Sequence, residues 1–158
     1  MNAKRVEKKA TDEPKPQGVR LYTLDVFIIG GPVTEKFLKR NPEISRTIQI
    51  RGDQTLEDLH DAIFEAFDRF DEHMYEFQFG KGPNDPKSKR YVLSDAFDPD
   101  ERNVAGNVAA TTIAALGLKV DQSFGYWFDF GDDWWHQINV AAIDDTVAKG
   151  KYLSLIHI

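Results

Sequence analysis

Thr55-Leu-Glu-Asp-Leu-His-Asp-Ala-Ile-Phe-Glu-Ala-Phe67 is the stretch of sequence that decides the fold. Thr55 and Asp58 form a capping-box pattern, with Asp in place of the usual Glu, which predicts where a helix begins. The apolar residues recur at intervals of three or four, the spacing of one helix face: Leu56, Leu59, Ile63, Phe67 and Phe70. We therefore expect an amphipathic helix of about four turns that packs on a sheet.

Strand-like segments lie on both sides of this helix. They are rich in β-branched and aromatic residues and end at turn residues: 21–29, 44–51, 75–79, 91–93, 124–130 and 134–143. Residues 34–40 are expected to form a helical turn or two, residues 94–110 an irregular connection, and residues 111–116 a short helix. The predicted fold class is α+β: a β-grasp-like mixed sheet with one long helix packed across it and a C-terminal aromatic hairpin. Another open α/β sandwich with a different strand order is the alternative.

Composition limits the functions open to this chain. Of the 158 residues, 41% are hydrophobic, which is enough for one buried core. The net charge of −6 argues against a surface that coats nucleic acid or an anionic membrane. The absence of cysteine excludes disulfides, cysteine-type zinc sites and a thiol nucleophile. No apolar run is long enough for a membrane helix, so a cytoplasmic location is expected by exclusion.

Both ends of the chain differ from the middle. Residues 1–20 carry six Lys or Arg and three acids, with few apolar residues, which predicts a disordered basic tail. Such a tail is the one part of the chain suited to nucleic acid. Residues 21–152 are expected to form a single domain. Residues 153–158 resemble translated adapter sequence, so we treat them as a candidate non-native end and give His157 no role.

The chemistry-bearing residues concentrate in residues 121–145. This segment holds six aspartates, all three tryptophans and no Lys or Arg. Aspartates beside aromatic rings can bind a cation or have raised pKa values. The candidate binding residues are Trp127, Asp129, Asp132, Asp133 and Trp135. The structural alternative is a hairpin whose rings fill the core while its aspartates form the turn.

Two stretches resemble the plasmid pRiA4b ORF-3-like family. The first is the helix segment quoted above followed by Asp71-Glu-His-Met-Tyr-Glu-Phe77, and the second is Tyr126-Trp-Phe-Asp-Phe-Gly-Asp-Asp-Trp-Trp-His-Gln-Ile138. The likeness covers about residues 21–143, and it implies a fold and a bacterial, mobile-element-associated protein rather than a particular reaction. Tyr75 departs from the pattern, because many members carry a second histidine there. The family pattern maps onto Leu59, His60, His73, Phe77, Asp129, Phe130, Gly131, Asp132, Trp134 and His136.

Three histidines are candidate metal ligands, because imidazole and carboxylate groups together suit zinc or another divalent ion. They are His60 on the helix, His73 before the third strand and His136 on the hairpin. Asp129 or Asp132 would complete the set. The alternative is that each histidine is half-buried and hydrogen-bonded to the backbone or to an aspartate, with no cofactor.

The register of the hairpin decides which of these residues meet. A three-residue loop at 131–133 pairs Phe128 with His136 and Phe130 with Trp134. A two-residue loop at 132–133 pairs Asp129 with His136 and allows a dyad. In the first register, Trp127 and Trp135 share the face away from Phe128, where they form either a partner site or part of a second core.

Two functions follow as hypotheses. The first is a non-catalytic binding module whose contact surface is the aromatic–acidic hairpin and whose partner is a protein or a cationic ligand. The second is a metal-dependent enzyme, such as a hydrolase acting on nucleic acid, which uses the histidines with Asp129 and Asp132. The association of the family with mobile elements motivates the nucleic-acid substrate by analogy alone.

Overall fold

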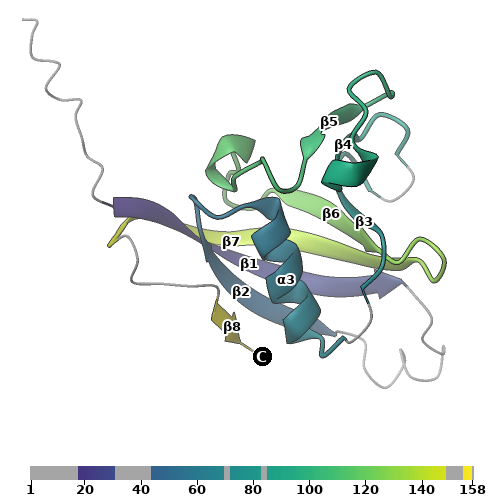
Figure 1. The fold of residues 1–158 in the computed structure, drawn as a ribbon. Coiled ribbons are helices and arrows are strands. Elements are labelled where there is room, and N and C mark those ends of the chain that lie inside the picture. Colours follow the sequence, from purple (N-terminus) through teal and green to yellow (C-terminus); the bar gives the residue numbers. More distant parts are fainter. Residues whose placement is uncertain (1–17, 31–43, 70–71, 83–84, 149–154, 158) are drawn as a thin grey trace, which may run out of the picture.

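The computed structural model describes residues 18–30, 44–69, 72–82, 85–148 and 155–157 (Figure 1). Its strands are β1 (Gly18–Gly30), β2 (Ser45–Arg51), β3 (Tyr75–Phe79), β4 (Lys89–Val92), β5 (Val104–Asn107), β6 (Ser123–Phe128), β7 (Trp134–Ala148) and β8 (Leu155–His157). Its helices are α3 (Leu56–Ala66) and the 3-10 turns η2 (Ser94–Ala96) and η3 (Ala114–Leu116). The predicted turn at 34–40 and the tail up to residue 17 lie outside these residues.

All eight strands belong to one sheet, in the order β5-β4-β3-β6-β7-β1-β2-β8. Every neighbouring pair is antiparallel except β4 and β5. The prediction of a β-grasp-like sheet under one long helix is therefore wrong: the sheet is wide and almost wholly antiparallel, and the only α-helix of the described residues has 11 residues. Local patterns could not reveal this order, because strand pairing depends on contacts between distant segments.

Helix α3 begins where the sequence predicts. The Asp58 backbone N–H donates to Thr55 Oγ1 at 3.1 Å, and the Thr55 N–H donates to Asp58 Oδ2 at 2.9 Å, so both halves of the capping box form. The helix ends at Ala66, earlier than predicted, because Asp68 adopts a left-handed backbone conformation with φ 55°. Asp tolerates this conformation better than most residues, so the chain turns away without a glycine.

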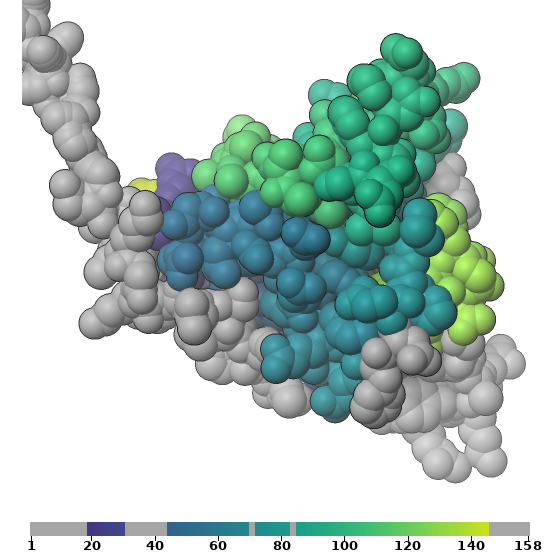
Figure 2. Space-filling model, viewed as in Figure 1, coloured from purple at the N-terminus to yellow at the C-terminus, as the bar shows by residue number. Residues whose placement is uncertain are grey.

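The core lies between α3 and one face of the sheet. Leu56, Leu59 and Ile63 are fully buried there, as the apolar stripe predicts. Tyr126 and Phe128 of β6 and Phe77 of β3 meet them from the sheet. Figure 2 shows α3 and the segments that follow β4 covering this face. The irregular connection predicted for 94–110 in fact contributes β5 to the sheet edge and Val108 to the core.

The hairpin of β6 and β7 has neither predicted register. Phe128 pairs with Trp134, Trp127 with Trp135 and Tyr126 with His136, which leaves a five-residue loop at 129–133. The loop turns at Asp129 and Asp133, which have φ of 63° and 57°, and not at Gly131. Asp129 holds it, because its carbonyl accepts from the N–H groups of Asp132 and Asp133.

Candidate functional site

The predicted site residues lie on opposite faces of the sheet. His60, His73 and His136 lie around Tyr126 and Phe128 on the side of α3. Trp127 and Trp135 lie on the other side, because neighbouring residues of a strand point to opposite faces. The loop aspartates lie at the end of the hairpin between the two groups. The structure therefore separates the aromatic candidates from the histidine candidates.

His60 is a buried helix residue with a partner at each ring nitrogen. Its imidazole stacks on Tyr75 with centroids 3.7 Å apart and planes 3° apart, and it is 2% exposed. Nδ1 lies 2.6 Å from the Tyr126 hydroxyl, and Nε2 lies 3.1 Å from Glu72 Oε1. Burial lowers the pKa of His60 despite the opposing effect of Glu72. A neutral ring satisfies both contacts if the Tyr126 hydroxyl donates to Nδ1 and the Nε2–H donates to Glu72.

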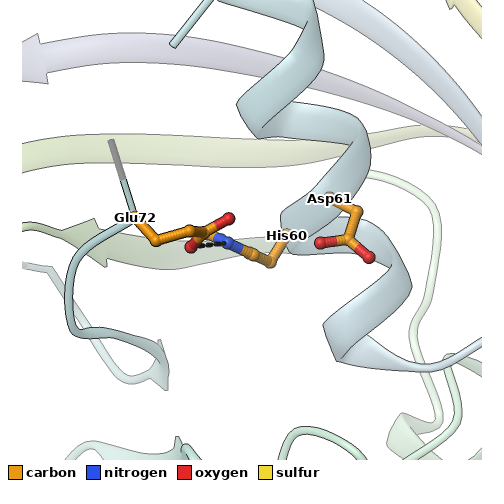
Figure 3. A group of neighbouring side chains, drawn as sticks. All are labelled: His60, Asp61 and Glu72. Atoms are coloured by element: carbon orange, nitrogen blue, oxygen red, sulfur yellow. Dashed lines mark hydrogen bonds and ion pairs between the residues drawn. The ribbon is translucent and has the colours of Figure 1, made fainter. Parts of the chain in front are cut away.

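Asp61 completes a group with His60 and Glu72 (Figure 3). One potential ligand atom from each of the three residues lies within 4.8 Å of the others, and this is the only such His, Asp and Glu group found in the described ranges. Sequence analysis missed Asp61 and Glu72. Neither stands at a recognised ligand spacing from His60, so no pattern could have found them.

His136 is fully buried and paired with Arg69. Arg69 Nη2 donates to His136 Nε2 at 2.9 Å, and His136 Nδ1–H donates to the Tyr126 carbonyl at 3.1 Å. Burial and the charge of Arg69 together lower the pKa of His136 to about 3. The imidazole is therefore neutral at physiological pH.

Arg69 itself lies among aromatic rings. Its guanidinium carbon is 4.9 Å from the ring centroid of Phe128, 5.1 Å from that of Phe67 and 5.2 Å from that of Trp134. Such contacts attract a cation to the faces of the rings. Burial lowers the pKa of Arg69. No sequence pattern singled out this residue, because its partners come from distant strands.

Asp129 contacts His73, and not His136 as an Asp129–His136 dyad would require. His73 Nε2 lies 3.5 Å from Asp129 Oδ2, while His136 faces Arg69. The other oxygen, Oδ1, accepts from the backbone N–H groups of Gly131 and Asp132, both at 3.2 Å. The pairing of Asp129 with His136 that a two-residue loop would have allowed therefore does not form, and Asp129 chiefly holds the loop.

The three histidines share aromatic neighbours, but their ring nitrogens have different partners. His60 and His73 both lie against Phe128, with ring centroids 5.9 Å and 5.8 Å away, and His60 and His136 both contact Tyr126. The ring nitrogens of the three histidines contact five different groups: the Tyr126 hydroxyl, Glu72, Arg69, the Tyr126 carbonyl and Asp129. The metal site on His60, His73 and His136 stays a prediction.

A stack of three rings, Phe130, Trp127 and Trp135, occupies the opposite face of the hairpin. Trp127 and Trp135 are parallel to within 2° with centroids 4.9 Å apart. Phe130 stacks on Trp127 at 4.0 Å and 25°. The Trp127 Nε1–H donates to Asp133 Oδ1 at 2.8 Å, which fixes the indole. The predicted pairing of Phe130 with Trp134 is wrong: Trp134 packs against the core, while Phe130 belongs to this three-ring stack.

A groove of about 60 Å³ lies beside the three-ring stack. Gly125 leaves a gap in β6, and the groove passes over it from Ile29 on β1 to Lys81 beyond β3. The groove lining includes Trp135 and the amides of Gln78 and Gln137. Ile29 is 49% exposed. This face therefore offers apolar surface next to hydrogen-bonding groups.

The family model for plasmid pRiA4b ORF-3-like proteins matches residues 36–157. This chain belongs to that family. The crystal structure of a protein of unknown function from Methanosarcina mazei Go1 is similar, with a TM-score of 0.64 and 22% sequence identity, and the match covers 89% of this chain and 69% of the other. At that identity the likeness shows the fold alone. None of the curated protein sequences is significantly similar to this chain.

Four polar residues that the sequence analysis singled out in this chain gather on one side of the sheet: His60, His73, Asp129 and His136. His60 and His73 contact the Phe128 ring, and Asp129 contacts His73. His136 lies one strand away and reaches the same ring through Arg69. None of the helices among the described residues of this pRiA4b ORF-3-like chain is long and apolar enough to cross a membrane.

Proposed function

We propose that this chain is a binding module that docks a protein partner on the sheet face opposite α3, with the three-ring stack at its centre. The observation that carries the proposal is the parallel pair Trp127 and Trp135 on the sheet face opposite α3. Gln137 and Ser123 on the same face are exposed. An antiparallel sheet with one solvated face normally carries polar residues there, so large rings at these positions favour an interface.

The ring faces of Trp127 are not available to a partner, so the partner must use the surface beside the three-ring stack. Trp127 is occupied by Phe130 on one face and Trp135 on the other. A cation can therefore not sit on either face of Trp127, although cation–π contacts are common for exposed tryptophan. The apolar surface that remains is the groove beside Trp135 and Ile29. It suits an apolar side chain of the partner.

The negative charge of the hairpin loop favours a basic residue of the partner next to its apolar side chain. Asp132 and Asp133 are exposed beside the three-ring stack, and the whole chain carries a net charge of −6. Opposite charge at the rim of an interface speeds association and selects among partners. The partner that fits best is a protein segment with an apolar side chain next to a Lys or Arg.

Gly125→Val tests the proposal without touching the tryptophans. A Cβ at Gly125 would lie 3.6 Å from its nearest neighbour, the Gln78 carbonyl oxygen, so a side chain fits and fills the groove. Valine is also a good strand residue. Gln49→Val is the matched control, because Gln49 lies on β2 of the same face, away from the groove lining.

The experiment selects binders from a displayed peptide library on the full chain and measures their affinities by fluorescence anisotropy. We expect peptides with an apolar residue beside Lys or Arg, about tenfold weaker binding to Gly125→Val, and unchanged binding to Gln49→Val. Peptides that bind all three proteins equally, or a selection without enrichment, would contradict the proposal.

A further inference from the structure

We propose that His60, Asp61 and Glu72 form a binding site for a divalent transition-metal ion, for which zinc is the reference ion. The three residues lie on the face of the sheet opposite the groove, so this site is independent of the proposed docking surface. Their ligand atoms already lie within 4.8 Å of one another. His60 and Asp61 come from α3, and Glu72 comes from the segment before β3. Figure 3 shows the His60 ring directed at Glu72, with Asp61 next to His60 on the helix.

The imidazole of His60 is held in place before any ion arrives. It is stacked on Tyr75 and is 2% exposed, so the ring has little freedom to rotate. Its Nε2 faces Glu72, whose side chain is 62% exposed. A rigid, buried nitrogen thus faces an exposed carboxylate. A ligand that is already fixed lowers the entropy lost on binding.

The spacing of Nε2 and Glu72 suits two ligands of one ion. At 3.1 Å, these atoms are as far apart as neighbouring ligands that each lie about 2.0–2.2 Å from zinc. The Asp61 carboxylate is exposed, and one of its oxygens lies within 4.8 Å of the ligand atoms of the other two residues. Three protein ligands then leave a position for water.

Tyr126 supplies the group that orients the histidine. Its hydroxyl lies 2.6 Å from Nδ1 and can either donate or accept. When Nε2 binds the ion, the one ring proton is carried by Nδ1, and the Nδ1–H donates a hydrogen bond to the Tyr126 oxygen. The imidazole stays neutral throughout. A hydrogen bond at the second ring nitrogen is the usual way in which a metal-bound histidine is fixed.

The surrounding charges favour a cation. Partial burial raises the pKa of Asp61, and His60 opposes this effect. The negative charges of Glu57, Asp58 and Glu72 raise the pKa further, and the first two lie on the first turn of α3. A divalent ion would offset this crowding of carboxylates. The nitrogen ligand favours zinc, cobalt or nickel over magnesium and calcium, which prefer oxygen.

Isothermal titration of the full chain with zinc sulfate tests the site. We expect one ion per chain, with affinity in the micromolar range because two ligands are exposed. Glu72→Gln should weaken binding about tenfold or more, since it removes a ligand. Glu65→Gln is the matched control, because Glu65 is an exposed carboxylate one helical turn from Asp61 that does not belong to the group. It removes a neighbouring charge but no ligand, so the affinity should stay within about threefold. His73→Ala and His157→Ala should likewise bind as the unchanged chain does.

A cobalt titration adds a spectroscopic check. Cobalt bound in place of zinc should give visible absorption that disappears in Glu72→Gln. Magnesium in excess should not displace it. Equal binding by Glu72→Gln and Glu65→Gln, loss of binding in His73→Ala or His157→Ala, or displacement by magnesium would overturn the proposal.

Discussion

Arg69 Nη2 lies 2.9 Å from His136 Nε2, so a guanidinium donates its hydrogen bond to a neutral buried imidazole. A protonated His136 would lose this bond and face a second positive charge. The folded protein therefore favours neutral His136. The free energy of unfolding should depend on pH because protonation of His136 is disfavoured in the folded state.

The first prediction concerns that pH dependence. The pKa of His136 falls from 6.5 to about 3 on folding, so the unfolded chain takes up a proton below pH 6.5 while the folded chain does not. The free energy of unfolding therefore falls as the pH drops from 6.5 toward 3, by up to about 1.4 kcal/mol per pH unit. Between pH 7.5 and 5.5, the unchanged chain should lose about 1 kcal/mol more than His136→Gln. Urea denaturation at the two pH values measures this, and equal losses would show that His136 does not titrate on unfolding.

The second prediction concerns the hydroxyl that His60 uses. Tyr126→Phe leaves the buried Nδ1 of His60 without its partner and should lower the free energy of unfolding by about 1–3 kcal/mol. The double variant Tyr126→Phe with His60→Phe removes both polar groups. It should be less destabilised than the sum of the two single variants, as a double-mutant cycle from chemical denaturation will show. Strict additivity would mean that the 2.6 Å contact contributes nothing.

The third prediction compares two glycines. Gly117 has φ 64°, and alanine there should lower the free energy of unfolding by about 1 kcal/mol. Gly131 does not have a positive φ, and a Cβ on it would be 3.5 Å from the nearest atom, Asp129 Oδ1. Gly131→Ala should therefore change the free energy of unfolding by less than about 0.5 kcal/mol. Thermal denaturation of both variants measures the two changes. A larger loss of stability in Gly131→Ala than in Gly117→Ala would contradict the loop geometry.

The fourth prediction concerns the start of α3. Thr55→Ala removes the acceptor for the Asp58 N–H, and the free energy of unfolding should fall by about 1 kcal/mol. Glu65→Ala, exposed and late in the same helix, serves as the control and should have little effect. Denaturant midpoints of the two variants provide the comparison. A Thr55 variant as stable as the control would argue that tertiary packing alone sets where α3 begins.

Local signals in the sequence predicted local structure. The capping box and apolar stripe placed the start and the buried face of α3 correctly, because both depend on residues three or four apart. The end of the helix and the hairpin register were missed. Both depend on aspartates with positive φ, Asp68 and Asp129, which the sequence does not distinguish from ordinary loop aspartates.

The candidate sites could be predicted only in part. Trp127 and Trp135 share one face, as alternation along two paired strands requires. The contact of His136 with Arg69 joins residues 67 positions apart, which no local pattern can reveal. His60 and Glu72 are 12 positions apart, which is not a recognised ligand spacing. The strand order was beyond reach for the same reason.

The central position of β7 has a consequence for how the protein is made on the ribosome. β7 lies between β6 and β1, so it joins β6 to β1, the first strand of the described residues. Until β7 is synthesised, β1 keeps an edge of unpaired backbone N–H and C=O groups, and such edges recruit strands from other chains. Premature release from the ribosome would therefore leave an aggregation-prone fragment, and slow synthesis would prolong that exposure.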